Sequence, residues 1–230
     1  MMGEGGIAFT ISIWALPVLL AVTFHEAAHG WVAWKLGDDT AKRLGRVTFN
    51  PFRHIDPVGT VLMPAALLFL SGGRMMFGFA KPVPVDFRRL RPLRLGMVLV
   101  AAAGPGTNVL LALLAAGAFH LLPLLEGDFQ RWVGFNLMNT VWINALLAVF
   151  NMLPLPPLDG GRVAVGLLPE PLSRALARLE RVGILVILAA LFILPSIGAS
   201  IGVDLNIFTW LVLSPAQWLT EVIFSVTGVR

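Results

Sequence analysis

The sequence predicts an all-α membrane protein that crosses the bilayer several times. Of its 230 residues, 57% are hydrophobic and 13% are charged, and the mean hydropathy is +0.82. A soluble domain of this length carries about 25% charged residues. Several apolar runs also approach the roughly 20 residues that a helix needs to cross a bilayer. Together these observations exclude an ordinary soluble domain.

Five apolar segments are predicted to be spanning helices. We expect the first to be retained, because the residues before it lack the basic region of a secretory signal. A sixth apolar run, 58–70, has 13 residues with Pro64 in the middle, which is typical of a re-entrant segment. The five expected spans are about 7–36, 95–122, 132–153, 182–194 and 207–226.

The basic residues favour the re-entrant interpretation and give an orientation. If the N-terminus is outside and 58–70 does not cross, 16 of the 17 Lys and Arg residues lie on the inner side, and only Arg131 lies outside. Cytoplasmic loops carry such an excess of basic residues. We therefore expect a protein of the cell membrane with its N-terminus outside. The net charge of +4 comes from these loops and does not indicate nucleic-acid binding.

The chain is expected to form a single domain over residues 1–230. The sequence has no long linker, low-complexity tract or internal repeat. We divide the domain into a core at about 7–162 and C-terminal helices at about 174–228. The oligomeric state is left open.

A metal-binding motif, His25-Glu26-Ala27-Ala28-His29, lies inside the first apolar segment. The chain has no cysteine, so a metal must be held by His, Asp or Glu. Histidines four residues apart share one helix face and can bind a single Zn²⁺, and Glu26 beside them can accept a proton from a zinc-bound water. The alternative is that these side chains only form hydrogen bonds between helices, but burying them in lipid without a partner is expensive.

A catalytic zinc site has three protein ligands and one open position, so a third ligand is needed. The candidate is Asp159, which follows the third expected span on the inner side, where the first helix also emerges. Prolines stiffen the approach, and Gly160 and Gly161 permit an unusual turn after the carboxylate. On spacing alone, an ordinary helix stop with a solvated aspartate is an equal alternative.

Three motifs occur in the order found in site-2 proteases, the intramembrane zinc metalloproteases of family M50. They are the HEAAH helix, the run Gly104-Pro105-Gly106-Thr107-Asn108, and the run from Asn151 to Gly160 that contains Leu-Asp-Gly. The resemblance covers about residues 25–162. The chain resembles a minimal form of the family, without room for a PDZ domain between the core helices or a CBS pair at the C-terminus.

The resemblance implies the site residues and the cofactor. By position, His25, His29 and Asp159 are expected to bind Zn²⁺, and Glu26 is expected to be the catalytic base. The resemblance also implies that the helices carrying the three motifs form a three-helix core. The Asp159 assignment thereby becomes the favoured one.

Asn108 places a side-chain amide at mid-membrane depth. One interpretation is a contact with the substrate backbone or the oxyanion of the reaction, because an amide N–H stabilises such a charge. The other is a hydrogen bond between helices at a face of small residues. The resemblance favours the functional interpretation.

A small β-sheet at the inner membrane surface is also predicted. Residues 46–50 alternate polar and apolar, and residues 77–85 have Phe77, Phe79, Val83 and Val85 on one face. Pro82 and Pro84 leave one edge without N–H donors, while the other edge can pair. The sheet either accepts an unwound substrate strand or is a structural hairpin.

His54 and Asp56 precede the re-entrant segment. They could form a proton-handling pair behind the zinc ligands. A polar loop in which Asp56 forms a turn before Pro57 accounts for the pattern equally simply, and we favour it.

The expected function is hydrolysis of peptide bonds in single-span membrane proteins within the lipid bilayer, at a site open to the cytoplasmic side. Zn²⁺ would lower the pKa of its bound water, and Glu26 would take the proton. A zinc transporter and a zinc-binding scaffold without activity are the alternatives. A transporter needs ligands that exchange across both faces, whereas the expected ligands lie towards one side.

Overall fold

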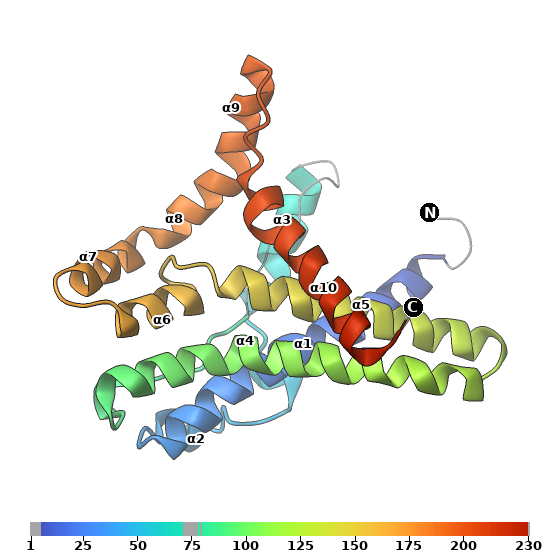
Figure 1. Cartoon of the computed structure of the whole chain (residues 1–230), viewed down its shortest axis with the longest axis horizontal. Helices are drawn as coiled ribbons and strands as arrows, with labels where there is room; N and C mark the ends of the chain where they lie inside the picture. Colours follow the sequence, from blue (N-terminus) through green and yellow to red (C-terminus); the bar gives the residue numbers. More distant parts are fainter. Residues whose placement is uncertain (1–5, 71–77, 79, 230) are drawn as a thin grey trace.

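All regular structure in the computed structural model, which describes residues 6–70, 78 and 80–229, is helical (Figure 1). Within these residues, four helical stretches are long and apolar enough to cross a membrane: Ala8–Lys35, Leu93–Leu124, Gly127–Asn151 and Gly183–Ile201. The predicted all-α membrane class is therefore confirmed.

The described residues contain ten α-helices. They are α1 (Gly6–Lys35), α2 (Thr40–Arg43), α3 (Met63–Leu70), α4 (Leu93–Ala118), α5 (Gly127–Asn151), α6 (Asp159–Leu167), α7 (Leu172–Arg178), α8 (Gly183–Leu188), α9 (Leu194–Ile201) and α10 (Ser214–Thr227).

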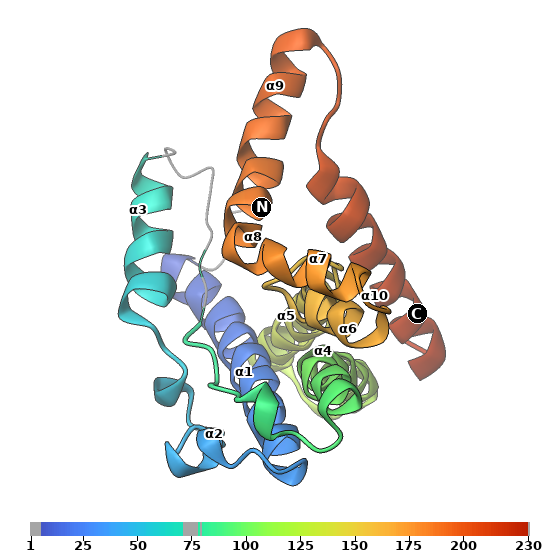
Figure 2. The same cartoon turned by 90° about the vertical axis from the view of Figure 1, so that its left-hand side faces the viewer.

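Three long helices, α1, α4 and α5, pack against one another and form the core, with α10 against α4 and α5 (Figures 1 and 2). Small residues permit this close approach: Ala112, Ala115 and Ala116 of α4 are buried against Val141 of α5 and Ile223 of α10. Helices in lipid associate through such small-residue faces because lipid supplies no hydrophobic driving force between them.

Large apolar side chains cover the outside of the helices. Examples are Ile11, Leu114 and Leu185, which are 59%, 61% and 63% exposed. A soluble monomer rarely exposes apolar patches of this extent, whereas lipid solvates them. The surface therefore fits the bilayer that the composition predicted.

The fourth predicted span is longer than expected. We ended it at Leu194 before Pro195, but the helix continues through α9 to Ile201. A wider, π-type turn at Ala189–Ile193 directly precedes this proline. Proline removes one backbone donor and clashes with the preceding turn, and a π-type turn relieves both effects.

Four of the five expected spans correspond to candidate spans in the described residues. The expected span at 207–226 is helical through a π-type turn at Thr209–Leu213 and α10, but it is not among the four candidate spans. The expected re-entrant run forms a continuous helical segment from Pro57 to Leu70. Its 14 residues reach about 21 Å, which is less than the ~30 Å hydrocarbon core.

The predicted β-sheet is wrong for the residues that the structure describes. Residues 47–49 form a bend and residues 80–85 have no regular structure; Phe77 and Phe79 lie outside the described residues. The N–H groups that a partner strand would use are bound by other groups. Lys81 N–H donates to the carbonyl of His54, and Val83 N–H donates to the carboxylate of Glu26. A period-two pattern suggests a strand but carries no information on its partner.

Candidate metal centre

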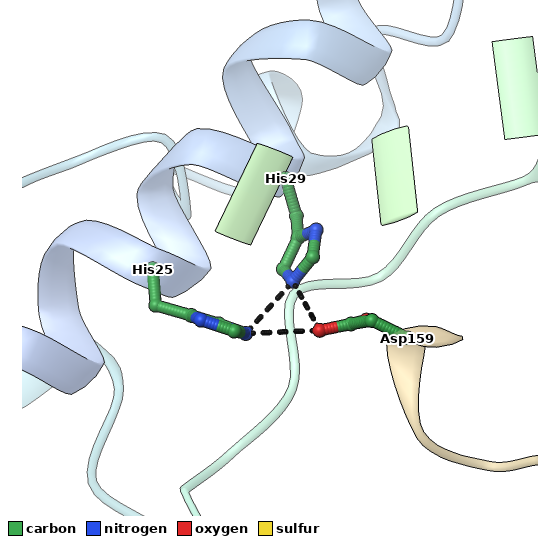
Figure 3. A group of neighbouring side chains, drawn as sticks. All are labelled: His25, His29 and Asp159. Carbon is green, nitrogen blue, oxygen red and sulfur yellow. Dashed lines mark hydrogen bonds and ion pairs between the residues drawn. The ribbon is translucent and has the colours of Figure 1, made fainter. Parts of the chain in front are cut away.

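The second half of α1 carries His25, Glu26 and His29. Both histidines are buried, at 7% and 8% exposure. Along the helix axis they lie about 15 Å and 9 Å from Lys35, the last residue of α1. The i, i+4 spacing places both imidazoles on one side of α1, facing Asp159 at the start of α6 (Figure 3).

The three side chains form a compact triangle of potential ligand atoms. His25 Nε2 lies 3.0 Å from His29 Nε2, and Asp159 Oδ2 lies 3.2 Å and 3.3 Å from these two nitrogens. Ligand atoms held at 2.0–2.1 Å from a tetrahedral Zn²⁺ are about 3.3 Å apart. Within the described residues, this is the group of His, Asp and Glu side chains that could hold a metal.

The protonation pattern of the histidines supports a metal here. His29 Nδ1 lies 2.7 Å from the backbone carbonyl of Val100, and His25 Nδ1 lies 2.6 Å from Oδ1 of Asn108. Both Nδ1 atoms therefore carry the hydrogen, which leaves a lone pair on each Nε2. Two nitrogen lone pairs and a carboxylate then face one another, an arrangement that a cation would stabilise. The donor set fits Zn²⁺.

Asp159 reaches the site because α6 packs directly on the loop that precedes it. A side chain at Gly160 would overlap with the backbone of Met152, and one at Gly161 would overlap with Pro156. Neither glycine has a positive φ, so close approach, and not the unusual turn that we expected, requires them.

Gly104 of α4 provides the room for the two imidazoles. A Cβ at this position would lie 2.6 Å from His25 Nε2 and closer still to His29 Nε2. The first glycine of the GPG run therefore leaves room for both rings.

Glu26 faces a cavity of about 500 Å³ beside the triangle. One oxygen of its carboxylate accepts a hydrogen bond of 2.7 Å from the backbone N–H of Val83. The cavity is lined by the three candidate ligands and Glu26. Its other lining residues include Ala80, Pro82, Val83 and Val85, and Ile184 and Ile187 of α8. Glu26 thus lies beside the candidate ligands, in contact with a space that a substrate segment and water could enter.

Asn108 lies behind His25, away from the cavity. It is 0% exposed, its Oδ1 faces His25, and its Nδ2 donates to Asn144 and, more weakly, to the carbonyl of Ala21. These bonds match the second interpretation of Asn108, a hydrogen bond between helices. Its other contact is with a candidate ligand, His25, and not with the cavity that a substrate would enter. Asn144 was not predicted, although a polar residue inside an apolar span is a signal of function.

His54 and Asp56 are not brought to the three candidate ligands. His54 Nε2 lies 3.0 Å from the carbonyl of Thr48, and the carboxylate of Asp56 accepts from the N–H groups of Val58 and Gly59. Neither residue lines the cavity at Glu26. The turn-forming role that we favoured for Asp56 matches this geometry.

Comparisons with known proteins agree with the site. Residues 126–194 match the model of peptidase family M50. The chain is 39% identical over 187 residues to "Putative zinc metalloprotease YwhC" of Bacillus subtilis, covering 78% of this chain and 80% of that protein. It is 32% identical over 182 residues to Rip2 of Mycobacterium tuberculosis, named in the same way, covering 78% of this chain and 66% of that protein. No solved structure matches the chain at a comparable level.

Proposed function

Because the chain belongs to peptidase family M50 and is a zinc metalloprotease, we propose that it cleaves membrane proteins within the bilayer, at a zinc held by His25, His29 and Asp159. The observation that carries the proposal is the triangle of ligand atoms on α1 and α6 with Glu26 beside it. The histidines lie within an apolar helix that can cross the membrane. A peptide bond must therefore come to the zinc inside the protein.

The bound zinc would act as a Lewis acid and lower the pKa of a water molecule in its open position. Glu26 accepts the proton of the attacking water and returns it to the leaving amine. The N–H of Val83 holds one oxygen of the Glu26 carboxylate and leaves the other for this proton. Asp159 and the two histidines hold the metal, and their partners behind the site fix the rings.

The proposed topology has five spans, with the segment at 57–70 re-entrant and the N-terminus outside. The basic loops support this orientation, and the short length of the Pro57–Leu70 helical segment supports re-entry. The active site then opens towards the cytoplasmic side of the cell membrane, and the whole chain forms one domain. Fusing a reporter that is active on only one side of the membrane to each loop tests this orientation.

The proposed substrate is a single-span membrane protein. A helix hides its peptide bonds, so a substrate segment has to unwind before it reaches the zinc. Ala80, Pro82, Val83 and Val85 line the cavity and offer a surface along which an unwound segment can lie. Cleavage of a purified single-span reporter in lipid vesicles, lost with a zinc chelator and restored by Zn²⁺, tests the proposal. A wild type that binds zinc and cleaves no reporter favours a scaffold, and zinc uptake into vesicles favours a transporter.

Replacing Asp159 with Ala is expected to weaken zinc binding by at least about 100-fold, because one of three protein ligands is lost. Zinc affinity is measured by competition with a chelator of known affinity. Asp204→Ala is the matched control, because Asp204 is an exposed aspartate that contacts its own turn. Wild-type zinc affinity in Asp159→Ala would remove Asp159 from the ligand set.

Replacing Val83 with Pro is expected to reduce kcat by roughly 10-fold to 100-fold and to leave zinc bound. The change removes the N–H that holds the Glu26 carboxylate, and a misplaced catalytic group costs about this much. Reporter cleavage and zinc content are measured on the same preparation.

Val85→Pro is the comparison for this variant. Val85 is two residues from Val83 and lines the same cavity. If the N–H of Val83 acts through Glu26, only Val83→Pro loses activity. An equal loss in both variants indicates instead that the whole edge pairs with the substrate. Full activity in Val83→Pro contradicts both roles.

A further inference from the structure

A chain of hydrogen bonds crosses the interior of the three-helix core. His25 of α1 lies 2.6 Å from Asn108 Oδ1 of α4, and Asn108 Nδ2 lies 2.7 Å from Asn144 Oδ1 of α5. Asn144 Nδ2 in turn lies 2.9 Å from the backbone carbonyl of Thr140. Both asparagines are 0% exposed, so water does not replace any member of the chain.

In this series of hydrogen bonds, the last one, from Asn144 to the carbonyl of Thr140, determines which group donates and which accepts in each of the others. A backbone carbonyl can only accept a hydrogen bond, so the amide NH₂ of Asn144 must face Thr140. The Oδ1 of Asn144 is then the atom that faces Asn108, and it can only accept from the NH₂ of Asn108. Asn108 consequently presents its own Oδ1 to His25, which must donate from Nδ1.

The two histidines are therefore held in the same tautomer by different means. For His29 a backbone carbonyl, that of Val100, accepts from Nδ1 directly. For His25 an amide accepts, and an amide can present either its oxygen or its NH₂. If the Asn108 amide turned round, His25 would carry its hydrogen on Nε2, which cannot bind a metal in that form.

We propose that Asn144 is a positioning residue for the metal centre: through Asn108 it keeps the lone pair of His25 on Nε2. The carbonyl of Ala21 also accepts from Asn108, at 3.3 Å, and gives a second, longer restraint. Loss of Asn144 therefore weakens the metal site without abolishing it. This inference rests on the proposed role of His25 as a ligand, which the zinc content of the wild type and of a His25→Ala variant tests separately.

The test replaces Asn144 with Leu or with Ser. Leu removes both hydrogen bonds, whereas Ser keeps a bond to the carbonyl of Thr140, as Thr140 does to that of Asn136. Ser is too short to reach Asn108 and secures the test if the Leu variant does not fold. Both variants are expected to bind zinc about 10-fold more weakly, the lower end of the effect of residues behind a metal site. Their Co²⁺-loaded forms are expected to show an altered visible absorption spectrum.

Asn144→Asp and Asn136→Leu are the matched controls. A buried aspartic acid is protonated and can still donate to Thr140 and accept from Asn108, so the Asp variant is expected to retain wild-type affinity. Asn136 is a buried asparagine on the same helix that donates to the carbonyl of Trp132 and does not touch Asn108. If Asn136→Leu changes zinc affinity and the Co²⁺ spectrum as much as Asn144→Leu does, the effect is one of packing and the proposal is overturned.

A double-mutant cycle shows whether Asn144 acts through Asn108. In an Asn108→Leu background, the further change Asn144→Leu is expected to leave zinc affinity unchanged. An additional 10-fold loss in that background overturns the proposal, as does wild-type zinc affinity with a wild-type Co²⁺ spectrum in both Asn144→Leu and Asn144→Ser.

Discussion

Replacing Glu26 with Gln is expected to abolish cleavage while zinc remains bound. Gln has nearly the same shape and can still accept from the N–H of Val83, so the site keeps its geometry. Its amide cannot take a proton from the attacking water. Loss of general acid–base catalysis costs about 10²–10⁴-fold in rate. Reporter cleavage in vesicles and zinc content of the same sample measure both parts of the prediction.

Glu221→Gln is the matched control for this variant. Glu221 lies on α10, in a second hollow lined by Phe119 and Phe224, and it does not line the cavity at Glu26. The control is expected to cleave the reporter at the wild-type rate. Cleavage that persists in Glu26→Gln contradicts Glu26 as the base, and loss of its zinc assigns Glu26 to metal binding instead.

The part of the site that lies on one helix could be predicted from the sequence. His25 and His29 are four residues apart in an apolar segment, and helix geometry alone places them on one side. Asp159 is 130 residues beyond His29, and no local rule connects two such positions. Spacing left its role open, the resemblance to site-2 proteases favoured it, and the folded chain brings its carboxylate to the two imidazoles.

The contacts of residues 80–85 could not be predicted in the same way. The alternation of side chains there predicted a strand, but the structure has no regular structure at these residues. The pattern carries no information on which group accepts from each N–H. In the folded chain the acceptor for Val83 is the Glu26 carboxylate, 57 residues away, so the expected strand partner is replaced by a side chain of the active site.

The orientation of polar groups behind the site also depends on tertiary contacts. Asn108 was identified from its depth in the membrane, but its role depends on whether its oxygen or its NH₂ faces His25. That choice is fixed by Asn144 on another helix. A single sequence shows that buried amides need partners, but not which partners they find.

Replacing Gly104 with Ala is expected to abolish zinc binding, and with it all cleavage. The added methyl group would lie 2.6 Å from Nε2 and Cε1 of His25 and closer still to His29 Nε2, so both imidazoles would have to leave the positions in which they face Asp159. Both rings are held from behind by Asn108 and by the carbonyl of Val100, so they cannot retreat without losing a buried hydrogen bond. We expect zinc affinity to fall by at least about 100-fold, measured by chelator competition.

Gly106→Ala provides the matched control two residues further along α4. A Cβ at Gly106 meets no atom within 4 Å, so the same change there adds a methyl group in open space. Ala also favours a helix over Gly by about 1 kcal/mol, so both variants have the same effect on helix propensity. A loss of zinc in Gly104→Ala alone must then arise from the filled space. Wild-type zinc affinity in Gly104→Ala would mean that the metal lies away from the triangle of His25, His29 and Asp159.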